Sequence, residues 1–168
     1  MDIVKTATEW SKDELFSSLF FILFGIMFVV GSIGFWQLGK TDVAKSFIYP
    51  MLIAGALLLT AGIGFFFGNK SRLTNIETEY KANPSAFVQS EIERTEKTMG
   101  EYQNIAFKVF PLIIAVAALL MVFVNSPTWR AISIVTIATL LMIILIDSNA
   151  HARIKAYNEQ LLLVEEQN

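Results

Sequence analysis

The stretch LFSSLFFILFGIMFVVGSIGFWQL, residues 15–38, contains no charged side chain and decides the class of the protein. A helix needs about 20 mainly apolar residues to cross the hydrocarbon core of a bilayer, and this stretch exceeds that length. Acidic residues precede it where a cleaved signal peptide would carry positive charge, and the apolar run is too long for such a peptide. We therefore expect a permanent transmembrane helix.

Three further segments have the length and composition of transmembrane helices, and they are residues 48–67, 105–124 and 129–146. Apolar residues make up 54% of the chain and charged residues 17%, compared with about 45–50% and about 25% in soluble domains. Charge is missing from whole helix circumferences and not from one face only, which argues against a soluble helical bundle. We predict an all-α integral membrane protein with one four-span domain over residues 1–168.

The distribution of Lys and Arg predicts the orientation of these four helices. The two ends of the chain, the segment 69–104 and Lys108 hold ten of the thirteen Lys and Arg residues. The short connections on the opposite side hold only Lys40, Lys45 and Arg130. Because positive side chains collect on the cytoplasmic side of a membrane, we expect both termini in the cytoplasm (N-in/C-in).

The hydrophilic parts also carry a helical pattern. Apolar residues recur at alternating intervals of three and four through residues 69–104, and again through residues 147–166. We predict that helices 2, 3 and 4 extend from the membrane into a small cytoplasmic helical bundle. Its seam would contain Ile92, Met99, Tyr102, Ile154, Tyr157 and Leu161. We expect Ile3, Ala7 and Trp10 to form a short interfacial helix beside this bundle.

Several sequence features predict helix ends and bends. Ser11 and Glu14 have the spacing of a capping box, which predicts a helix start at Ser11. Pro84 and Pro127 each follow polar residues and are expected at the first position of a helix, where the missing N–H costs nothing. Pro111 lies inside an apolar helical pattern, so we expect a bend in the third transmembrane helix.

Small residues within the apolar segments predict close helix packing. Gly64 and Gly68 form a GxxxG pattern, which allows two helix backbones to approach in a membrane. Ala61 and Gly62 extend this small face, and the first helix carries Gly25 and Gly31. The pattern fits packing within the chain and also fits an interface with a partner or with a second copy of the chain.

The fourth transmembrane helix ends at a pair of titratable residues, Asp147 and His151. Their spacing of four residues would allow contact on one helix face, and His titrates near neutral pH. One interpretation is a pH-sensitive pair, and the other is simply the point where the helix leaves the membrane. The glutamates of the segment 69–104 lie among basic residues, so we expect them on a solvated face.

The residue types exclude several classes of chemistry. The chain has no cysteine, and no Glu is followed by His at the spacing of di-iron sites, so we expect no metal centre. Nucleophile–base pairs, phosphate-binding loops and dinucleotide fingerprints are missing, and we therefore expect neither an enzyme nor a cofactor. The net charge of −2 gives no indication of nucleic-acid binding. The transmembrane segments also lack the buried charges that ion-coupled transporters use.

In size and topology the chain resembles four-span inner-membrane immunity proteins, which act against pore-forming bacterial toxins through helix–helix recognition. This resemblance implies a non-enzymatic protein of the bacterial inner (cytoplasmic) membrane. It would bind another membrane protein within the lipid bilayer, most concretely as an immunity or inhibitor protein. Self-association is the other expected contact. The alternatives are a membrane-anchored signalling adaptor, and a homo-oligomeric channel or small transporter with a pore lined by Ser133, Thr136 and Thr139.

Overall fold

The computed structural model describes residues 3–166 and contains only helices over that range. In chain order they are α1 (Ile3–Leu38), α2 (Asp42–Ser46), α3 (Ile48–Ala82), α4 (Pro84–Glu101), the π-helix η1 (Tyr102–Val109), α5 (Phe110–Phe123) and α6 (Pro127–Glu165). Four helical runs are long and apolar enough to cross a membrane: α1, α2 with α3, α4 through α5, and α6. The prediction of four such helices is confirmed.

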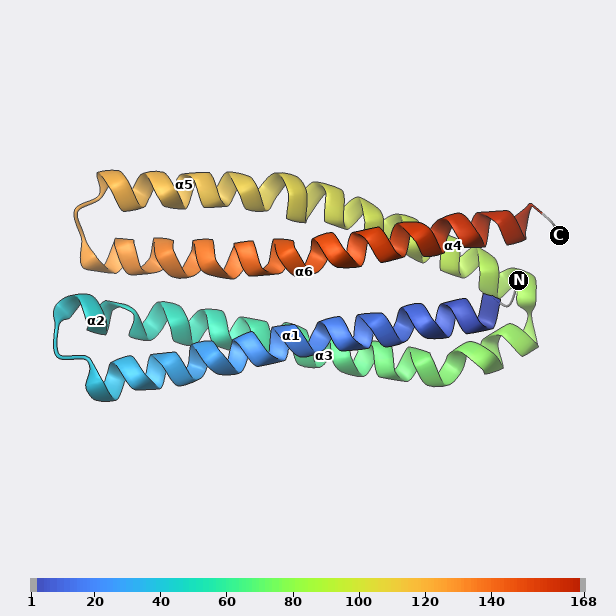
Figure 1. Ribbon diagram of the computed structural model, residues 1–168, viewed down its shortest axis with the longest axis horizontal. Helices are drawn as coiled ribbons and strands as arrows, with labels where there is room; N and C mark the ends of the chain where they lie inside the picture. Colours follow the sequence, from blue (N-terminus) through green and yellow to red (C-terminus); the bar gives the residue numbers. More distant parts are fainter. Residues whose placement is uncertain (1–2, 167–168) are drawn as a thin grey trace.

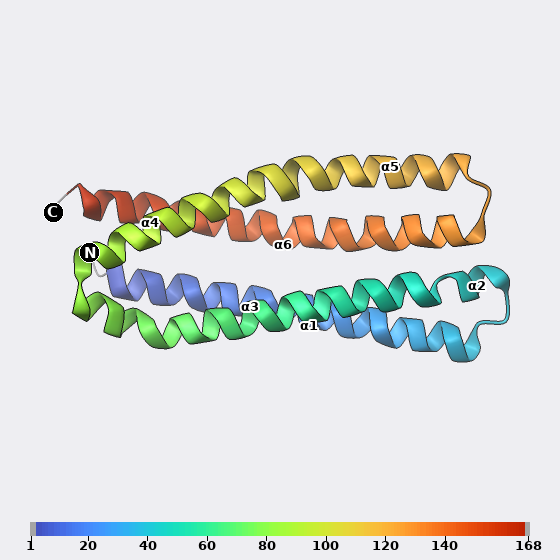
Figure 2. The ribbon, with the colours of Figure 1, turned by 180° about the vertical axis from the view of Figure 1, so that it is seen from behind.

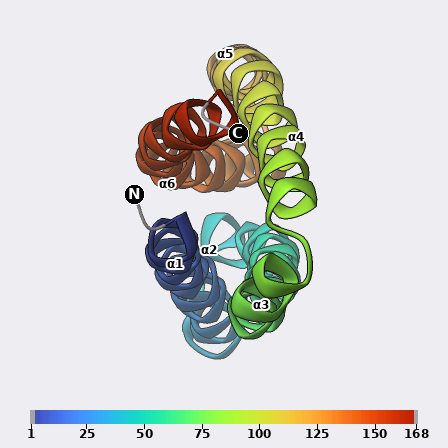
Figure 3. The same cartoon turned by 90° about the vertical axis from the view of Figure 1, so that its right-hand side faces the viewer.

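The helices form two antiparallel hairpins that lie side by side (Figures 1 and 2). α1 and α3 form the first hairpin, and the continuous run from α4 to α5 forms the second with α6. We call the end with the α3–α4 turn, the start of α1 and the end of α6 the base. The opposite end, with α2 and residues 124–126, is the loop end. The view from the base shows α1, α3, α4 and α6 arranged around a common centre (Figure 3).

Glycines allow close approach inside the first hairpin. A Cβ atom at Gly25 would lie 2.9 Å from the backbone nitrogen of Leu59, and one at Gly55 would lie 2.9 Å from the carbonyl oxygen of Gly25. A Cβ atom at Gly62 would likewise lie 2.9 Å from the backbone nitrogen of Ile22. Such contacts leave no room for a side chain, so α1 and α3 pack backbone against backbone, as small residues permit in membranes.

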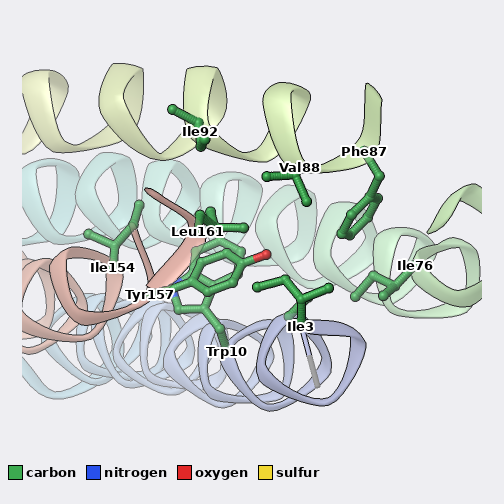
Figure 4. Packing of buried hydrophobic residues seen from close by; sticks show 10 residues of the cluster. Ile3, Trp10, Ile76, Phe87, Val88, Ile92, Ile154, Tyr157 and Leu161 are labelled. Atoms are coloured by element: carbon green, nitrogen blue, oxygen red, sulfur yellow. The ribbon is translucent and has the colours of Figure 1, made fainter. Parts of the chain in front are cut away.

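The largest group of buried side chains lies at the base, where all four long helices meet (Figure 4). Its members are Ile3, Ala7, Trp10, Ile76, Phe87, Val88, Ile92, Ile154, Tyr157 and Leu161. The first three belong to α1 and contact residues of the other helices, so the expected separate interfacial helix is wrong. Residues 3–14 instead continue α1 without a break, because their apolar face is covered by α3, α4 and α6. All four helices, and not three, therefore extend into the base.

The helix starts agree with the sequence at two of three positions. α4 begins at Pro84, and the side chain of Asn83 accepts a hydrogen bond of 3.1 Å from the backbone N–H of Ala86. α6 begins at Pro127, also as predicted. The expected helix start at Ser11 is wrong, because Ser11 lies fully buried in the interior of α1. Burial of the preceding turns at the base outweighs the local capping pattern.

A π-helix precedes the proline of the third transmembrane run. The N–H of Phe110 donates to the carbonyl of Ile105, five residues back, where an α-helix would use four. Pro111 follows at once and has no N–H to donate. The wider turn changes the helical phase, and Val109 at its end is 46% exposed. The run bends across the bundle at this point (Figures 1 and 2).

The hairpins also touch at the loop end. The Ser46 hydroxyl, at the end of α2, donates a hydrogen bond of 3.1 Å to the carbonyl of Pro127 at the start of α6. α2 itself is capped by Thr41, whose hydroxyl oxygen accepts from the N–H of Ala44 at 3.1 Å. The two connections at the loop end are therefore joined to one another.

We predict that Gly25→Ala destabilises the protein and that Gly34→Ala does not. The added methyl group at position 25 would overlap the backbone of α3, whereas at position 34 no atom lies within 4 Å. The free energy of unfolding should fall by about 1–3 kcal/mol for Gly25→Ala and stay equal or rise by up to about 1 kcal/mol for Gly34→Ala. Unfolding by SDS in mixed micelles, followed by circular dichroism, measures both. Equal stabilities of the two variants would contradict the close α1–α3 contact.

Candidate functional site

A buried carboxylate, Glu91 of α4, lies at the centre of the base. Its side chain is only 4% exposed and forms ion pairs with Arg72 of α3 and with Arg94 one turn along α4, the second at 2.7 Å. The hydroxyl of Tyr157, from α6, donates a hydrogen bond of 2.8 Å to the same carboxylate. One glutamate thus connects three helices.

Trp10 of α1 completes this cluster. The guanidinium of Arg94 lies 4.3 Å from the centre of the indole ring, and that of Arg72 lies 5.7 Å from it. The Tyr157 ring stacks on the same indole with a centroid distance of 5.4 Å and an interplanar angle of 16° (Figure 4). Cation–π and stacking contacts of this kind attach α1 to the charged group. We call Trp10, Arg72, Glu91, Arg94 and Tyr157 the base cluster.

The base cluster controls the protonation of its members. Burial alone would raise the pKa of Glu91, but Arg72 and Arg94 outweigh it and hold the pKa below its ordinary value of 4.5. Burial, together with the neighbouring carboxylate of Glu91, raises the pKa of Tyr157. Tyr157 therefore remains a hydrogen-bond donor while Glu91 remains an acceptor.

The solvated face predicted for the glutamates is wrong at Glu91, which is 3% exposed. The chain contained a usable indication. Glu91 stands three residues after Val88 and four before Thr95, which are both buried on the same face of α4 as the predicted seam residue Ile92. An acidic residue on a buried helix face requires a partner of opposite charge. In the structure these partners are Arg72 and Arg94.

The seam residues lie at the base but are not equally buried. Ile92, Ile154, Tyr157 and Leu161 are buried members of the core, while Met99 and Tyr102 are partly buried and pack against it. Beside them, the amide of Asn158 donates a hydrogen bond of 2.7 Å to the hydroxyl of Thr95. This buried pair is a second polar link between α4 and α6 that the sequence pattern did not indicate.

A large cavity that opens to the outside lies between the two hairpins, in the apolar half of the bundle. It measures about 950 Å³ and is lined mainly by α3 and α6, with α2 residues at its loop end. Most lining side chains are apolar, among them Ile53, Leu57 and Leu140. Of the hydroxyl residues proposed for a pore, Thr136 and Thr139 line this cavity, whereas Ser133 is buried and lies outside its lining.

A smaller cavity of about 520 Å³ lies next to the base and has a different character. Charged residues line it together with aromatic ones, and these charged residues are Glu14, Arg94, Glu101 and Asp147. Phe21, Ala61 and Ile143 line both this cavity and the larger one. The two spaces therefore meet at these three side chains.

Neither an ion pair nor a hydrogen bond joins Asp147 to His151 within residues 3–166, and the Nδ1 atom of His151 is buried without a hydrogen-bond partner there. Asp147 lines the smaller cavity, and its side chain has no ion-pair or hydrogen-bond partner in the part of the chain that the structure describes. His151 packs edge-on against Tyr102 and Phe107, with ring centres 6.0 and 5.5 Å away. The pair predicted from the spacing is thus separated into a cavity residue and a packing residue.

The four glycines proposed as a packing or partner interface divide into two groups. Gly25 packs against α3, and Gly31 faces the Met51 side chain, so both serve contacts within the chain. Gly64 and Gly68 are exposed, and no described atom lies within 4 Å of a Cβ built at either position. Ala61 and Gly62 do not share this face, because Ala61 lines the cavities and Gly62 packs against α1.

Comparisons with models of protein families, with curated proteins and with solved structures found no match to this chain. We therefore argue its function from the side chains, cavities and exposed faces described above.

We predict that Glu91→Gln lowers the free energy of unfolding by about 3–5 kcal/mol. The neutral amide leaves two partly buried guanidinium groups without a counter-charge. Glu93→Gln, on an exposed position of the same helix, is the matched control and should change stability by less than about 0.5 kcal/mol. SDS unfolding followed by tryptophan fluorescence measures both. If the two variants are equally stable, the base cluster does not hold the helices together.

The same carboxylate predicts an acid dependence of stability. Because its pKa is lower in the folded chain than in the unfolded chain, its contribution is complete above 4.5 and is lost as the pH falls through the folded pKa. The stability difference between the wild type and Glu91→Gln should therefore shrink as the pH is lowered below that value. Unfolding curves of both proteins across this range measure the difference. A constant difference would contradict the ion-pair assignment.

Proposed function

We propose that this protein recognises another membrane protein through helix–helix contact along an exposed face of α3. The observation that supports it is a stripe of small residues on that face: Ala56, Thr60, Gly64 and Gly68. All four are exposed in the described structure, and both glycines face open space. We call these four residues the small-residue face.

The composition of this face suits a partner helix in a bilayer. Small side chains at every fourth position let two backbones approach closely, which supplies packing where the hydrophobic effect is weak. The Thr60 hydroxyl donates to the carbonyl of Ala56 at 2.8 Å, so the face carries no unsatisfied hydroxyl into the apolar contact.

Other glycines of this chain already allow two helix backbones to approach closely. Gly25 and Gly55 bring α1 and α3 into backbone contact within the first hairpin. Gly64 and Gly68 lie on the same helix as Gly55 but point away from α1. The small-residue face thus has the chemistry of an internal packing seam without an internal partner.

We place the protein in the bacterial inner membrane with the base and both termini in the cytoplasm, because ten of thirteen Lys and Arg residues lie on that side. A protein that acts by binding needs no catalytic group. An immunity or inhibitor protein, which would block a membrane-targeting toxin by packing against its transmembrane helices, is the most concrete form of this proposal.

We predict that Gly64→Ile separates the protein from its partner without unfolding it. The branched side chain would hold the partner backbone away, while within this chain it would extend into open space. Gly34→Ile, also at a glycine with no neighbour within 4 Å, is the matched control on α1. The measurement is purification from native membranes in mild detergent, followed by native mass spectrometry.

A stoichiometric complex with a different membrane protein should be present for the wild type and for Gly34→Ile, and absent for Gly64→Ile. Survival of the complex in Gly64→Ile would rule out the small-residue face. A ring of identical chains would instead favour the channel, and a simple dimer of this chain would favour self-association. Unfolding curves of the three proteins show whether a loss of binding reflects a loss of the fold.

A further inference from the structure

The space between the hairpins is amphipathic along its length. The larger cavity, between α3 and α6, is mainly apolar, and the smaller one beside the base is lined by charged and aromatic residues. Phe21, Ala61 and Ile143 line both cavities, so the apolar and the charged walls lie next to one another. Such a space fits an amphiphile better than a purely apolar or a purely polar ligand.

Two of the carboxylates that line the smaller cavity have no counter-ion among the described residues. Glu14 has Arg153 at 3.1 Å, and Arg94 is paired with Glu91. The remaining acids on the cavity wall are Glu101, which is exposed, and Asp147. Arg72, the second base of the base cluster, is absent from the residues that line this cavity.

Three hydroxyl groups of this cavity have hydrogen-bond partners, whereas the buried indole Nε1 of Trp10, which also lines it, has none among the described residues. The Ser17 hydroxyl accepts a hydrogen bond of 2.6 Å from Arg153. Ser18 and Thr98 donate to backbone carbonyls of their own helices at 2.6 and 2.9 Å. Asp147, which is less than half exposed, is the less exposed of the two unpaired carboxylates on this wall.

An unpaired carboxylate in a region of low dielectric constant is costly, and a bound positive charge removes that cost. Aromatic rings on the same walls, those of Phe21, Phe65, Tyr102 and Phe110, attract cations to their faces. Phe21 and Phe65 already meet edge to face, with ring centres 5.5 Å apart. Carboxylate and rings thus favour a cation that also has apolar surface.

We propose that the smaller cavity binds a lipophilic organic cation, with its positive charge beside Asp147 and its apolar body against Phe21 and Ile143. The volume of about 520 Å³ suits an organic molecule and greatly exceeds the size of a bare metal ion. The binding site lies on the inner walls of the bundle and does not include the small-residue face, so it is independent of the proposed partner contact.

The test compares two probe ions that share size and shape but differ in charge, tetraphenylphosphonium and tetraphenylborate. The full chain is reconstituted in nanodiscs of phosphatidylcholine, and binding is measured by equilibrium dialysis against empty nanodiscs. We expect saturable binding of tetraphenylphosphonium at one site per chain. Tetraphenylborate should bind at least about tenfold more weakly, because it meets the carboxylate with the wrong sign.

Two variants, each with a matched control, locate the site. Asp147→Asn should weaken tetraphenylphosphonium binding about tenfold or more, while Asp13→Asn, an exposed acid outside the cavities, should leave it unchanged. Ile143→Trp should fill part of the smaller cavity and abolish binding. Leu145 lies on the same helix and is 68% exposed, so Leu145→Trp should leave binding unchanged. Circular dichroism and unfolding curves confirm that each variant is folded.

Equal binding of the two ions would overturn the proposal and show an unselective apolar cavity of the kind that a lipid chain fills. Absence of saturable binding by the wild type would also overturn it. So would undiminished binding by folded Asp147→Asn, since the charge would then lie elsewhere. Because the wild type alone decides the first two outcomes, the test does not depend on the stability of any variant.

Discussion

The whole base depends on one buried carboxylate that has to be matched by positive charge. Glu91 binds guanidinium groups from α3 and α4 and the hydroxyl of Tyr157 from α6. Trp10 brings in α1 through contacts with the same guanidiniums. A charge removed from water tolerates few arrangements, because losing any partner leaves the others uncompensated. The base cluster therefore restricts how four helices can be placed relative to one another, which apolar packing alone would do less strictly.

Away from the base, the hairpins are held by different means. Inside the first hairpin, Gly25 and Gly55 let backbones touch, and no space remains. Between the hairpins, larger side chains such as Leu57 and Leu140 line the cavity of about 950 Å³ without filling it. The distribution of glycine along α3 thus determines where the molecule is closed, where it is hollow and where it presents a bare helix face.

The sequence predicted those features that follow from local pattern. Length and apolarity identify a transmembrane helix by themselves, and the period of three and four places Ile92 and Tyr157 on a buried face. Features that depend on partners were missed. The burial of Glu91 requires Arg72 from another helix, and the continuation of α1 through Ser11 requires a core that covers its first turns. The separation of Asp147 from His151 depends on Tyr102 and Phe107, which the spacing of four residues does not include.

The hydrogen bond from Ser46 to Pro127 has a mechanical consequence. The base cluster acts as a pivot, and about 36 Å of helix separates Arg72 from the start of α3 at 1.5 Å per residue. A rotation of one degree between the hairpins at the base therefore moves their far ends apart by about 0.6 Å. At the loop end this lever meets the Ser46 contact, a single neutral hydrogen bond that contributes at most about 1 kcal/mol, because the same hydroxyl also donates to the carbonyl of Val43 at 2.7 Å. The spacing of the hairpins is therefore held mainly at the base and by the buried contacts of Phe21, Leu58 and Met142 midway along the bundle.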